Sequence, residues 1–508
     1  MKPLALAPEG SPLEGAPELS LDPEDWTSFR ELVRRAADEM MDYLETVRER
    51  PAWQRVPSQV QARFEAPPPV EGMEAARVYE EFRESILPFP EGNIHPRFWG
   101  WVIGTGTPVG VLAEMLAATM NTPVPGFEQS AYYVERQVMD WLRQLFLMPP
   151  EASGILVSGG SAANLIGLAV ARNQKAGIDV RTEGLAAAGV APMRVYASAE
   201  THSSVQKAVE LLGLGSRSLV LLPVGEDFRL DLGALREAVR EDRRRGFRPF
   251  CVVGNAGTTN TGAVDDLAIL ADFCAAEDLW FHVDGAFGAT AALSPRLRPL
   301  LQGMERADSL AFDLHKWAAM PYEVGGVFVR DAGAHARAFS LHAEYLNSLE
   351  AGASGNGTPF ADLGLQLSRG FRALKVWMSV KTFGLARMAA ILEQNVDQAR
   401  HLAALVQEHP RLQLLAPAGL NVVAFRYAAP GLREAALDAL NARLLLDLQE
   451  SGFAVPSGTT LRGRFALRVA SVNHRSRRED FAALVREVAR RGDALAAGPE
   501  PGRDRPGG

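Results

Sequence analysis

DLHKW, residues 313–317, is the stretch that decides the fold of this chain, and it follows the apolar segment LWFHVD at residues 279–284. The earlier segment has the composition of a buried strand and ends in Asp284. The later one places Lys316 between a histidine and a tryptophan. A lysine taken alone is far more often a solvated surface charge than a reactive amine. For Lys316, the other strand ends of the chain reverse that expectation.

A Gly/Ser turn follows an earlier strand. The segment GILVSGGSAAN at residues 154–164 passes from apolar residues into this turn, and a helix begins near Ala162. The turn includes Gly160 and Ser161, and its N–H groups and helix dipole can bind a phosphate. It is neither the dinucleotide glycine fingerprint nor a P-loop, because no Lys-Ser/Thr follows the glycines. Taken alone, it can equally be an ordinary strand-to-helix turn.

His202 falls where a short strand at residues 193–197 ends and a helix starts. This is the edge at which open α/β sheets bind ligands, and an imidazole there can stack on a flat ring. The alternative is a helix-capping segment, with Thr201 or Ser203 as the cap. Thr259 follows another apolar segment and is placed to hydrogen-bond near the same ligand, unless it belongs to a plain Thr-rich turn.

Together these strand ends predict a pyridoxal phosphate (PLP) site. The amine of Lys316 is expected to form a Schiff base with the cofactor aldehyde. Asp284 is expected to pair with the protonated pyridine nitrogen, which keeps the ring an electron sink. No metal site is predicted.

With these motifs, the chain resembles the group II PLP-dependent decarboxylases of the aromatic-L-amino-acid decarboxylase type. The resemblance spans nearly the whole chain and includes HPRFWG at residues 95–100, DWL at 140–142, SRGFRALKVW at 368–377 and LRVASVNHR at 467–475. It implies an α/β fold of the PLP-dependent transferase type (fold type I). It also implies that Lys316 carries the cofactor, that Asp284 pairs with the pyridinium, and that Ala286 and His202 contact the two faces of the ring. The residues that it places around the phosphate are Gly160, Ser161, Asp313 and His315.

The chain of 508 residues exceeds what one hydrophobic core usually organises. Helical segments alternate with short apolar strands over residues 95–377, and this pattern predicts a mostly parallel sheet with helices on both faces. We expect these residues to form the large PLP-binding domain. We expect a smaller C-terminal α+β domain at 378–496 and a disordered tail at 497–508. Residues 1–94 are expected to form an N-terminal helical arm.

The N-terminal arm carries an amphipathic helix, with Asp22 as a plausible cap and Pro23 in the first turn. Its apolar positions recur at helical spacing and include Phe29, Leu32, Val33, Ala36, Met40 and Tyr43. An apolar face of this kind needs a partner surface, and in the family this arm packs across a second subunit. We therefore expect a homodimer.

Composition excludes several classes of protein. Hydrophobic residues make up 47% and charged residues 22%, as in an ordinary globular protein. The net charge of −8 argues against nucleic acid as the partner. Cys251 and Cys274 lie in apolar contexts, as expected of buried thiols in a reducing compartment. We find neither a bilayer-spanning stretch nor an adequate apolar signal core, and predict a cytoplasmic protein without a membrane partner.

Substrate choice is expected near WVIG at residues 101–104, where Trp101, Val102 and Ile103 can line an apolar pocket or pack in the core. Aromatic decarboxylases usually carry a Tyr-Phe-Pro-like run here, so this chain departs from the family. The run offers no cation for a second carboxylate. We therefore expect an aromatic or bulky apolar L-amino acid, which is decarboxylated to the amine and CO₂.

A Gly-, Ser- and Asn-rich segment at residues 347–362 predicts a loop that closes over the active site. In the family this loop brings a tyrosine that protonates the carbanion, and counting back from Ser368 places Phe360 there. Family members with Phe at this position can act as aldehyde synthases, which is the alternative activity. Tyr345 is the nearest tyrosine.

Two other classes of protein are less consistent with the sequence. A PLP-dependent lyase or desulfurase acting on cysteine needs a reactive Cys on a mobile loop, and neither Cys251 nor Cys274 lies on one. A non-enzymatic PLP-fold scaffold would have lost Lys316 or Asp284, and both are present. Arg369 and Lys375 are expected to be surface or subunit-interface charges.

Overall fold

The computed structural model describes residues 19–126, 128–186, 190–341 and 359–497. Its centre is a seven-stranded sheet with the strand order β1-β7-β6-β5-β4-β2-β3. The strands are β1 Ser153–Val157, β2 Met193–Ser198, β3 Leu219–Leu222, β4 Arg248–Asn255, β5 Trp280–Gly285, β6 Ser309–Asp313 and β7 Gly325–Val329. Strands β2 to β6 pair in parallel, whereas β7 runs antiparallel to β1 and β6. The predicted mostly parallel sheet is confirmed.

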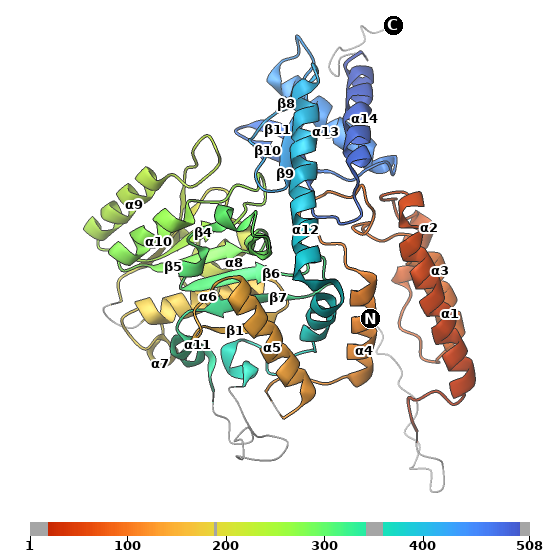
Figure 1. The fold of residues 1–508 in the computed structure, drawn as a ribbon, viewed down its shortest axis with the longest axis horizontal. Helices are drawn as coiled ribbons and strands as arrows, with labels where there is room; N and C mark the ends of the chain where they lie inside the picture. The colour runs from red at the N-terminus through yellow and green to blue at the C-terminus, as the bar shows by residue number, and fades with distance from the viewer. Residues whose placement is uncertain (1–18, 127, 187–189, 342–358, 498–508) are drawn as a thin grey trace.

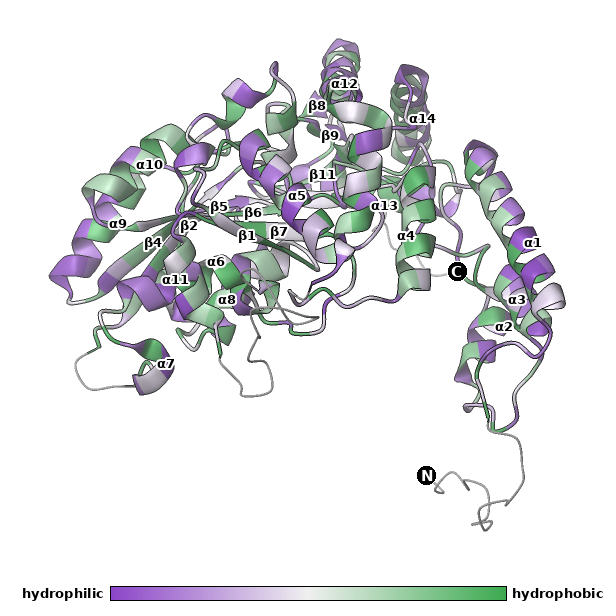
Figure 2. Ribbon diagram, turned by 60° about the horizontal axis from the view of Figure 1, so that its bottom comes forward, coloured by the Kyte–Doolittle hydropathy of each residue, from purple (hydrophilic) through white to green (hydrophobic). Residues whose placement is uncertain are grey.

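Helices cover both faces of this sheet (Figure 2). One face is covered by α6 Gly160–Lys175, α8 Ser203–Leu211 and α11 Ala332–Phe339, and the other by α5 Ser130–Leu145, α9 Leu232–Arg244 and α10 Leu267–Ala276. The strands β5, β6 and β7 are buried along their whole length, because helical layers cover both faces of the sheet. Cys251 and Cys274 are both buried, as predicted.

A second, four-stranded sheet has the strand order β10-β11-β9-β8. It consists of β8 Leu412–Leu414, β9 Val422–Tyr427, β10 Ser457–Leu461 and β11 Arg464–Ala470, with α13 Glu434–Glu450 and α14 Arg478–Ala497 packed against it. The long helix α12 Ala373–Glu408 connects the two sheets and is kinked at Gly384, whose φ is 69° (Figure 1). Ala497 ends α14, and the predicted tail beyond it lies outside the described residues.

Three N-terminal helices stand beside the rest of the molecule (Figure 1). They are α1 Trp26–Glu45, α2 Ser58–Gln61 and α3 Ala75–Ser85. The cap of α1 is Asp25 and not the expected Asp22, because the Asp25 carboxylate accepts the backbone N–H groups of Thr27 and Ser28. No residue of α1 is buried.

Shorter elements complete the described chain. The helices α4 Pro108–Met120 and α7 Val180–Glu183 are accompanied by 3-10 turns at Val47–Glu49, Ala62–Glu65, Ser216–Ser218, Ala289–Leu293, Arg298–Leu301, Met304–Arg306 and Phe360–Leu363. Among the helices of the described chain, none combines the length and apolar character needed to cross a bilayer.

Candidate active site

Lys316 follows the end of β6 in a short loop, and its amine lies 2.9 Å from Oδ2 of Asp313, the last residue of that strand. The Asp313 side chain is 1% exposed, so it needs a cationic partner in the core. Its other oxygen, Oδ1, has no hydrogen-bond partner among the described residues. The structure therefore pairs the Lys316 amine with the buried Asp313 carboxylate.

The glycine turn packs on Asp313. Helix α6 begins at Gly160, earlier than expected, and a Cβ on Gly160 would approach Ala286 Cβ to 2.8 Å and Asp313 Oδ2 to 3.0 Å. Only glycine permits this approach. The adjoining Ser161 is exposed at the first turn of α6, where a hydroxyl and free N–H groups can bind phosphate oxygens. The turn thus offers the donor chemistry that a phosphate requires.

Asp284 lies near the end of β5 and is 7% exposed. Its Oδ2 accepts a hydrogen bond from Nδ2 of Asn164 at 3.0 Å, and its Oδ1 accepts the backbone N–H of Ala286 at 3.1 Å. The sequence analysis did not assign a role to Asn164. Its signal was a polar residue in an otherwise apolar helical run. Thr259 is half-buried, and no hydrogen bond joins it to Asp284 among the described interactions.

His202 is the N-cap of α8, so the cap is neither Thr201 nor Ser203. Its Nδ1 accepts the backbone N–H of Ser204 at 3.2 Å and lies 2.8 Å from the Ser204 hydroxyl. Burial lowers the pKa of His202; the charge of Lys316 lowers it further, while Asp284 opposes the shift. The imidazole is therefore a neutral group that lies within the electric field of both predicted site residues.

His315 lies beside the glycine turn, as the resemblance implied. A Cβ on Gly159 would come within 3.1 Å of its Cε1. Its Nδ1 lies 2.9 Å from the carbonyl oxygen of Val324, and its ring is 4.5 Å from the ring of Tyr322. Burial lowers the pKa of His315, so the ring is held neutral next to the glycine turn.

The segment at residues 101–104 packs against the backbone of His315 and Lys316. A Cβ on Gly104 would overlap the carbonyl groups of His315 and Lys316. Trp101 is 50% exposed, whereas Val102 is buried in the main core and Ile103 packs on a smaller apolar cluster. Of the three predicted pocket residues, Val102 is thus a core residue.

Phe360 does not stand on an open loop. It is 6% exposed, and its ring lies 5.3 Å from the ring of Tyr132 and 5.2 Å from the guanidinium carbon of Arg369. In this conformation it is a packing residue, and its role in the substrate pocket stays a prediction. Tyr345 and most of the predicted loop lie outside the described residues.

The expectation that Arg369 and Lys375 are surface charges was wrong. Arg369 is 2% exposed and pairs with the fully buried Glu135, and Lys375 is 4% exposed and donates to the carbonyls of Pro321 and Glu323. Both cations hold the core around the site together.

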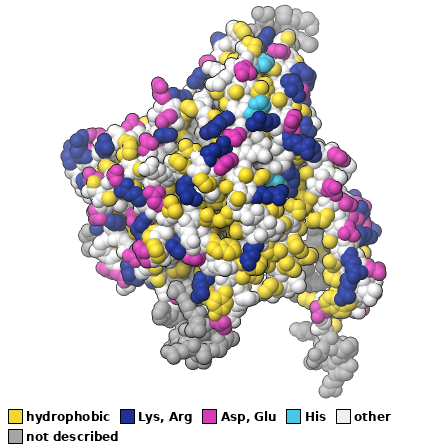
Figure 3. All heavy atoms as spheres, viewed as in Figure 1, with side chains coloured by type: hydrophobic (Ala, Val, Ile, Leu, Met, Phe, Trp, Pro, Cys, Tyr) yellow, Lys and Arg dark blue, Asp and Glu magenta, His cyan; other side chains and the backbone are white. Residues whose placement is uncertain are grey.

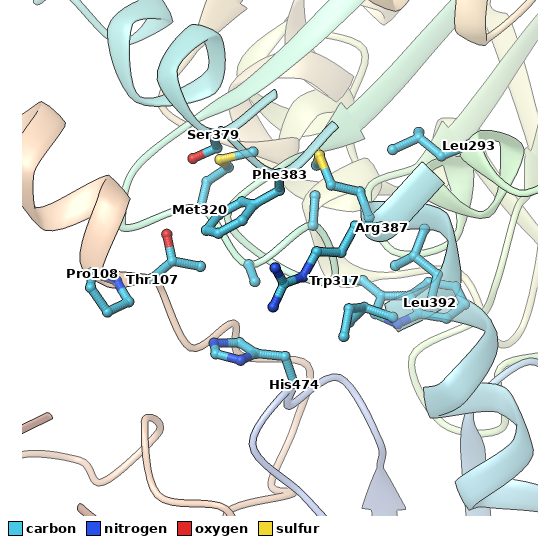
Figure 4. A pocket seen from close by; sticks show the side chains of 14 residues that line it. Thr107, Pro108, Leu293, Trp317, Met320, Ser379, Phe383, Arg387, Leu392 and His474 are labelled. Atoms are coloured by element: carbon cyan, nitrogen blue, oxygen red, sulfur yellow. The ribbon is translucent and has the colours of Figure 1, made fainter. Parts of the chain in front are cut away.

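A cavity of about 200 Å³ lies next to the loop that follows Lys316 (Figure 4). Its wall is mostly apolar and includes Trp317, Met320 and Phe383. Among the described residues, neither Lys316 nor Asp284 nor His202 lines it. This cavity is therefore separate from the predicted cofactor site.

Comparisons with known proteins agree with this geometry. The family described as the pyridoxal-dependent decarboxylase conserved domain matches residues 57–428. Aromatic-L-amino-acid decarboxylase of Bacillus atrophaeus is 33% identical over 464 residues, which cover 91% of this chain and 94% of that protein. Phenylacetaldehyde synthase of Petunia hybrida is 28% identical over 467 residues, which cover 89% of this chain and 90% of that protein.

A crystal structure of Oryza sativa TDC with PLP and tryptamine matches with a TM-score of 0.86 and 28% identity, covering 94% of this chain and all of that one. The predicted fold class, the PLP cofactor and the carboxy-lyase activity are confirmed by these comparisons. The chain belongs to the pyridoxal-dependent decarboxylase family.

Proposed function

We propose that this enzyme converts an aromatic or bulky apolar L-amino acid to the amine and CO₂, with Lys316, Asp284 and the glycine turn holding PLP. The observation that carries the proposal is the position of the Lys316 amine, 2.9 Å from the buried Asp313 carboxylate on which the glycine turn packs. The catalytic residues are Lys316, Asp284 and His202. The other cofactor contacts are Gly160, Ser161, Thr259, Ala286, Asp313 and His315.

When bound, PLP supplies an electron sink that stabilises negative charge at Cα of the substrate. The Asp284 carboxylate favours a proton on the pyridine nitrogen, because opposite charges attract strongly where water is excluded. Lys316 provides the amine that attaches the cofactor. The first turn of α6 would hold the phosphate. Contacts to the other substituents of the substrate would orient its carboxylate as the group that leaves.

The substrate class rests on the residues beside the lysine. The run at residues 101–104 contributes an exposed Trp101 and no cation, which favours an aromatic side chain over an acidic one. The name of the Bacillus atrophaeus relative supports the same class. The test is turnover of a panel of L-amino acids with amine, CO₂, aldehyde and peroxide measured together. Turnover of acidic amino acids alone would overturn the aromatic assignment.

An aldehyde synthase is the second candidate, and Phe360 favours it. A phenyl ring at the loop position has no proton to return to Cα, which leaves the carbanion exposed to O₂. The relative from Petunia hybrida is named for this kind of product. In the same assay, oxygen consumption and peroxide would separate this activity from plain decarboxylation.

We also propose a cytoplasmic homodimer built from the domains outlined above. Trp26 is 55% and Val33 is 42% exposed on α1. Hydrophobic side chains gather on the surface over α4 and the adjoining part of α12 (Figure 3). The large hydrophobic residues exposed on α4 are Val111, Leu112, Met115, Leu116 and Met120. Large apolar patches usually mark interfaces. Sedimentation that showed an active monomer at micromolar concentration would contradict the dimer.

A further inference from the structure

Asn164 joins the two sides of the candidate cofactor site. This fully buried side chain on α6 donates from Nδ2 to Asp284 Oδ2 at 3.0 Å and to the Ser204 hydroxyl at 2.9 Å. Its Oδ1 lies 2.9 Å from Nε2 of His282, which is also fully buried. One amide therefore connects His282 and Asp284 of β5 with Ser204, which bonds to the α8 cap, His202.

The ionised carboxylate fixes the orientation of this amide. A carboxylate only accepts hydrogen bonds, so the Asn164 atom that faces Asp284 must be the NH₂ group. The oxygen of Asn164 then faces His282, whose Nε2 must carry a proton in order to donate to it. Burial lowers the pKa of His282 to about 4, so the ring is neutral and its Nδ1 is an acceptor.

The hydrogen bonds of Ser309 and Trp280, on the other side of His282, agree with a proton on Nε2 of His282. Nδ1 of His282 lies 2.8 Å from the Ser309 hydroxyl, and that oxygen accepts the indole N–H of Trp280 at 2.8 Å. An indole N–H can only donate, so the Ser309 proton is free to point at His282. Gly167 on α6 makes room for this contact, because a Cβ there would lie 2.7 Å from the His282 ring.

The other arm reaches His202. The Ser204 oxygen accepts from Asn164, which leaves the Ser204 proton to donate to Nδ1 of His202 at 2.8 Å. The backbone N–H of Ser204 donates to the same nitrogen. With Nδ1 occupied as an acceptor, the proton of the neutral imidazole must be on Nε2. Among the described residues, no hydrogen bond engages that Nε2.

We propose that Asn164 is a positioning residue that links Asp284 and His202 in one directed hydrogen-bond relay, so that His202 presents an Nε2–H to the reacting groups. The relay runs from Trp280 through Ser309 and His282 to Asn164, where it divides. It holds the Asp284 carboxylate in one fixed orientation. It also excludes the tautomer of His202 that is protonated at Nδ1, in which Nε2 would present a lone pair to the site. This inference rests on the proposed roles of Asp284 and His202.

Two physical effects make the relay consequential. A buried polar group is costly when it loses its partner, so each member holds its neighbours in place. A neutral imidazole with a fixed Nε2–H can hand a proton only at that atom, which determines where the site can deliver one. Loss of Asn164 would remove one of the bonds that hold the Asp284 carboxylate and, at the same time, the bond that orients the Ser204 hydroxyl towards His202.

The first test is the tautomer of the two histidines in the apoenzyme, read by ¹⁵N NMR of protein labelled at histidine. Signals are assigned by their loss in His202→Gln and His282→Gln. We expect an unprotonated Nδ1 and a protonated Nε2 in both rings near neutral pH. A protonated Nδ1 on either ring would overturn the direction of the relay. This measurement needs neither cofactor nor turnover.

The second test is Asn164→Ala. A hydrogen bond to a charged group contributes enough that cofactor affinity of the apoenzyme should fall on the order of 10- to 100-fold, with a similar loss in kcat and little change in KM. The matched control is Asn441→Ala, because Asn441 is a fully buried amide on α13 with bonds to Tyr427 and Leu437. Equal cofactor affinity and turnover in the two variants would refute the positioning role.

Asn164→Asp separates positioning from packing, because the side chain keeps its shape. The new carboxyl group would face Asp284 and His282 from β5 and Ser204 from α8, which in turn bonds to His202. As an anion it cannot donate to Asp284, whereas the protonated form can. We expect the kcat of this variant, relative to wild type, to rise as the pH falls. Parallel pH profiles would show that only the shape of residue 164 matters.

Ser204→Ala removes one link without disturbing the bond between Asn164 and Asp284. We expect a weaker version of the Asn164→Ala effect, whereas Ser379→Ala, at a buried serine with no hydrogen-bond partner in the described part of the chain, should leave turnover unchanged. Failure of the relay can be distinguished from failure of the proposed function. If Lys316→Ala abolishes turnover but all Asn164 variants behave like Asn441→Ala, only the relay is wrong.

Discussion

The guanidinium group of Arg369 pairs with the carboxylate of Glu135 in the core, and the two side chains are 1% and 0% exposed. Arg369 also donates to the carbonyls of Val124 and Leu156, so one side chain joins α5, β1 and the segment before α12. Burial raises the pKa of Glu135, and the Arg369 charge opposes that shift. The pair is a structural element next to β1, the strand that leads into the glycine turn.

Arg369→Ala should destabilise the apoenzyme by roughly 3 to 5 kcal/mol, because it leaves the Glu135 charge buried without a partner. Urea denaturation at fixed protomer concentration measures this. The double variant Arg369→Met with Glu135→Leu should recover much of the loss, since it removes both charges. A loss below about 1 kcal/mol in the single variant would mean that water reaches the pair.

Lys316→Ala should abolish turnover and the visible absorbance of the bound cofactor. The Lys316 amine lies 2.9 Å from the buried Asp313 carboxylate, on which the glycine turn packs. Borohydride reduction of the wild-type enzyme followed by peptide mass spectrometry should find the cofactor on Lys316. Cofactor found on a different lysine would contradict the assignment of Lys316 as the cofactor-binding residue.

Asp284→Asn should retain PLP but lose turnover on the order of 10²- to 10³-fold, because the amide cannot supply the charge that keeps the pyridine nitrogen protonated. Single-turnover kinetics measure the loss. Asp242→Asn is the control, since Asp242 is a buried acid that accepts from Tyr196 outside the site. Near-normal rates in Asp284→Asn would contradict the role given to this carboxylate.

Phe360→Tyr should shift output towards amine if the loop residue reaches the reacting carbon during turnover. In the structure the ring packs on Tyr132, so this reach requires the segment to leave its core position. Oxygen consumption per CO₂ released is the measurement. If the wild-type enzyme forms amine in equal amount to CO₂ and consumes no oxygen, Phe360 is a packing residue only.

Stability should fall as the pH drops from about 6.5 to about 4. His282 has a folded pKa of about 4, set by burial, against about 6.5 when exposed, so only the unfolded chain gains the proton in this window. This one group contributes about 3 kcal/mol that is present above that window and lost across it. His282→Gln should flatten the pH dependence of the urea midpoint. An unchanged slope would show that His282 titrates normally.

The sequence by itself determined the fold class and the main site. Apolar runs that end in Asp284, Gly160 and His202 are local patterns, and the carboxyl ends of parallel strands meet at one edge of a sheet. For that reason the order of the strand ends was enough to predict a PLP site at Lys316. The resemblance to a known family then predicted the cofactor and the type of reaction.

Only the tertiary structure decided which side chains support that site. Asn164 and Asp284 bond across 120 positions, and Arg369 and Glu135 across 234. Such contacts depend on how helices pack on the sheet, and no local spacing encodes them. Burial likewise turned Phe360 from a predicted loop residue into a core residue, because neighbours distant in the chain close over it. Local pattern therefore specified the reactive groups, and long-range packing specified what holds them.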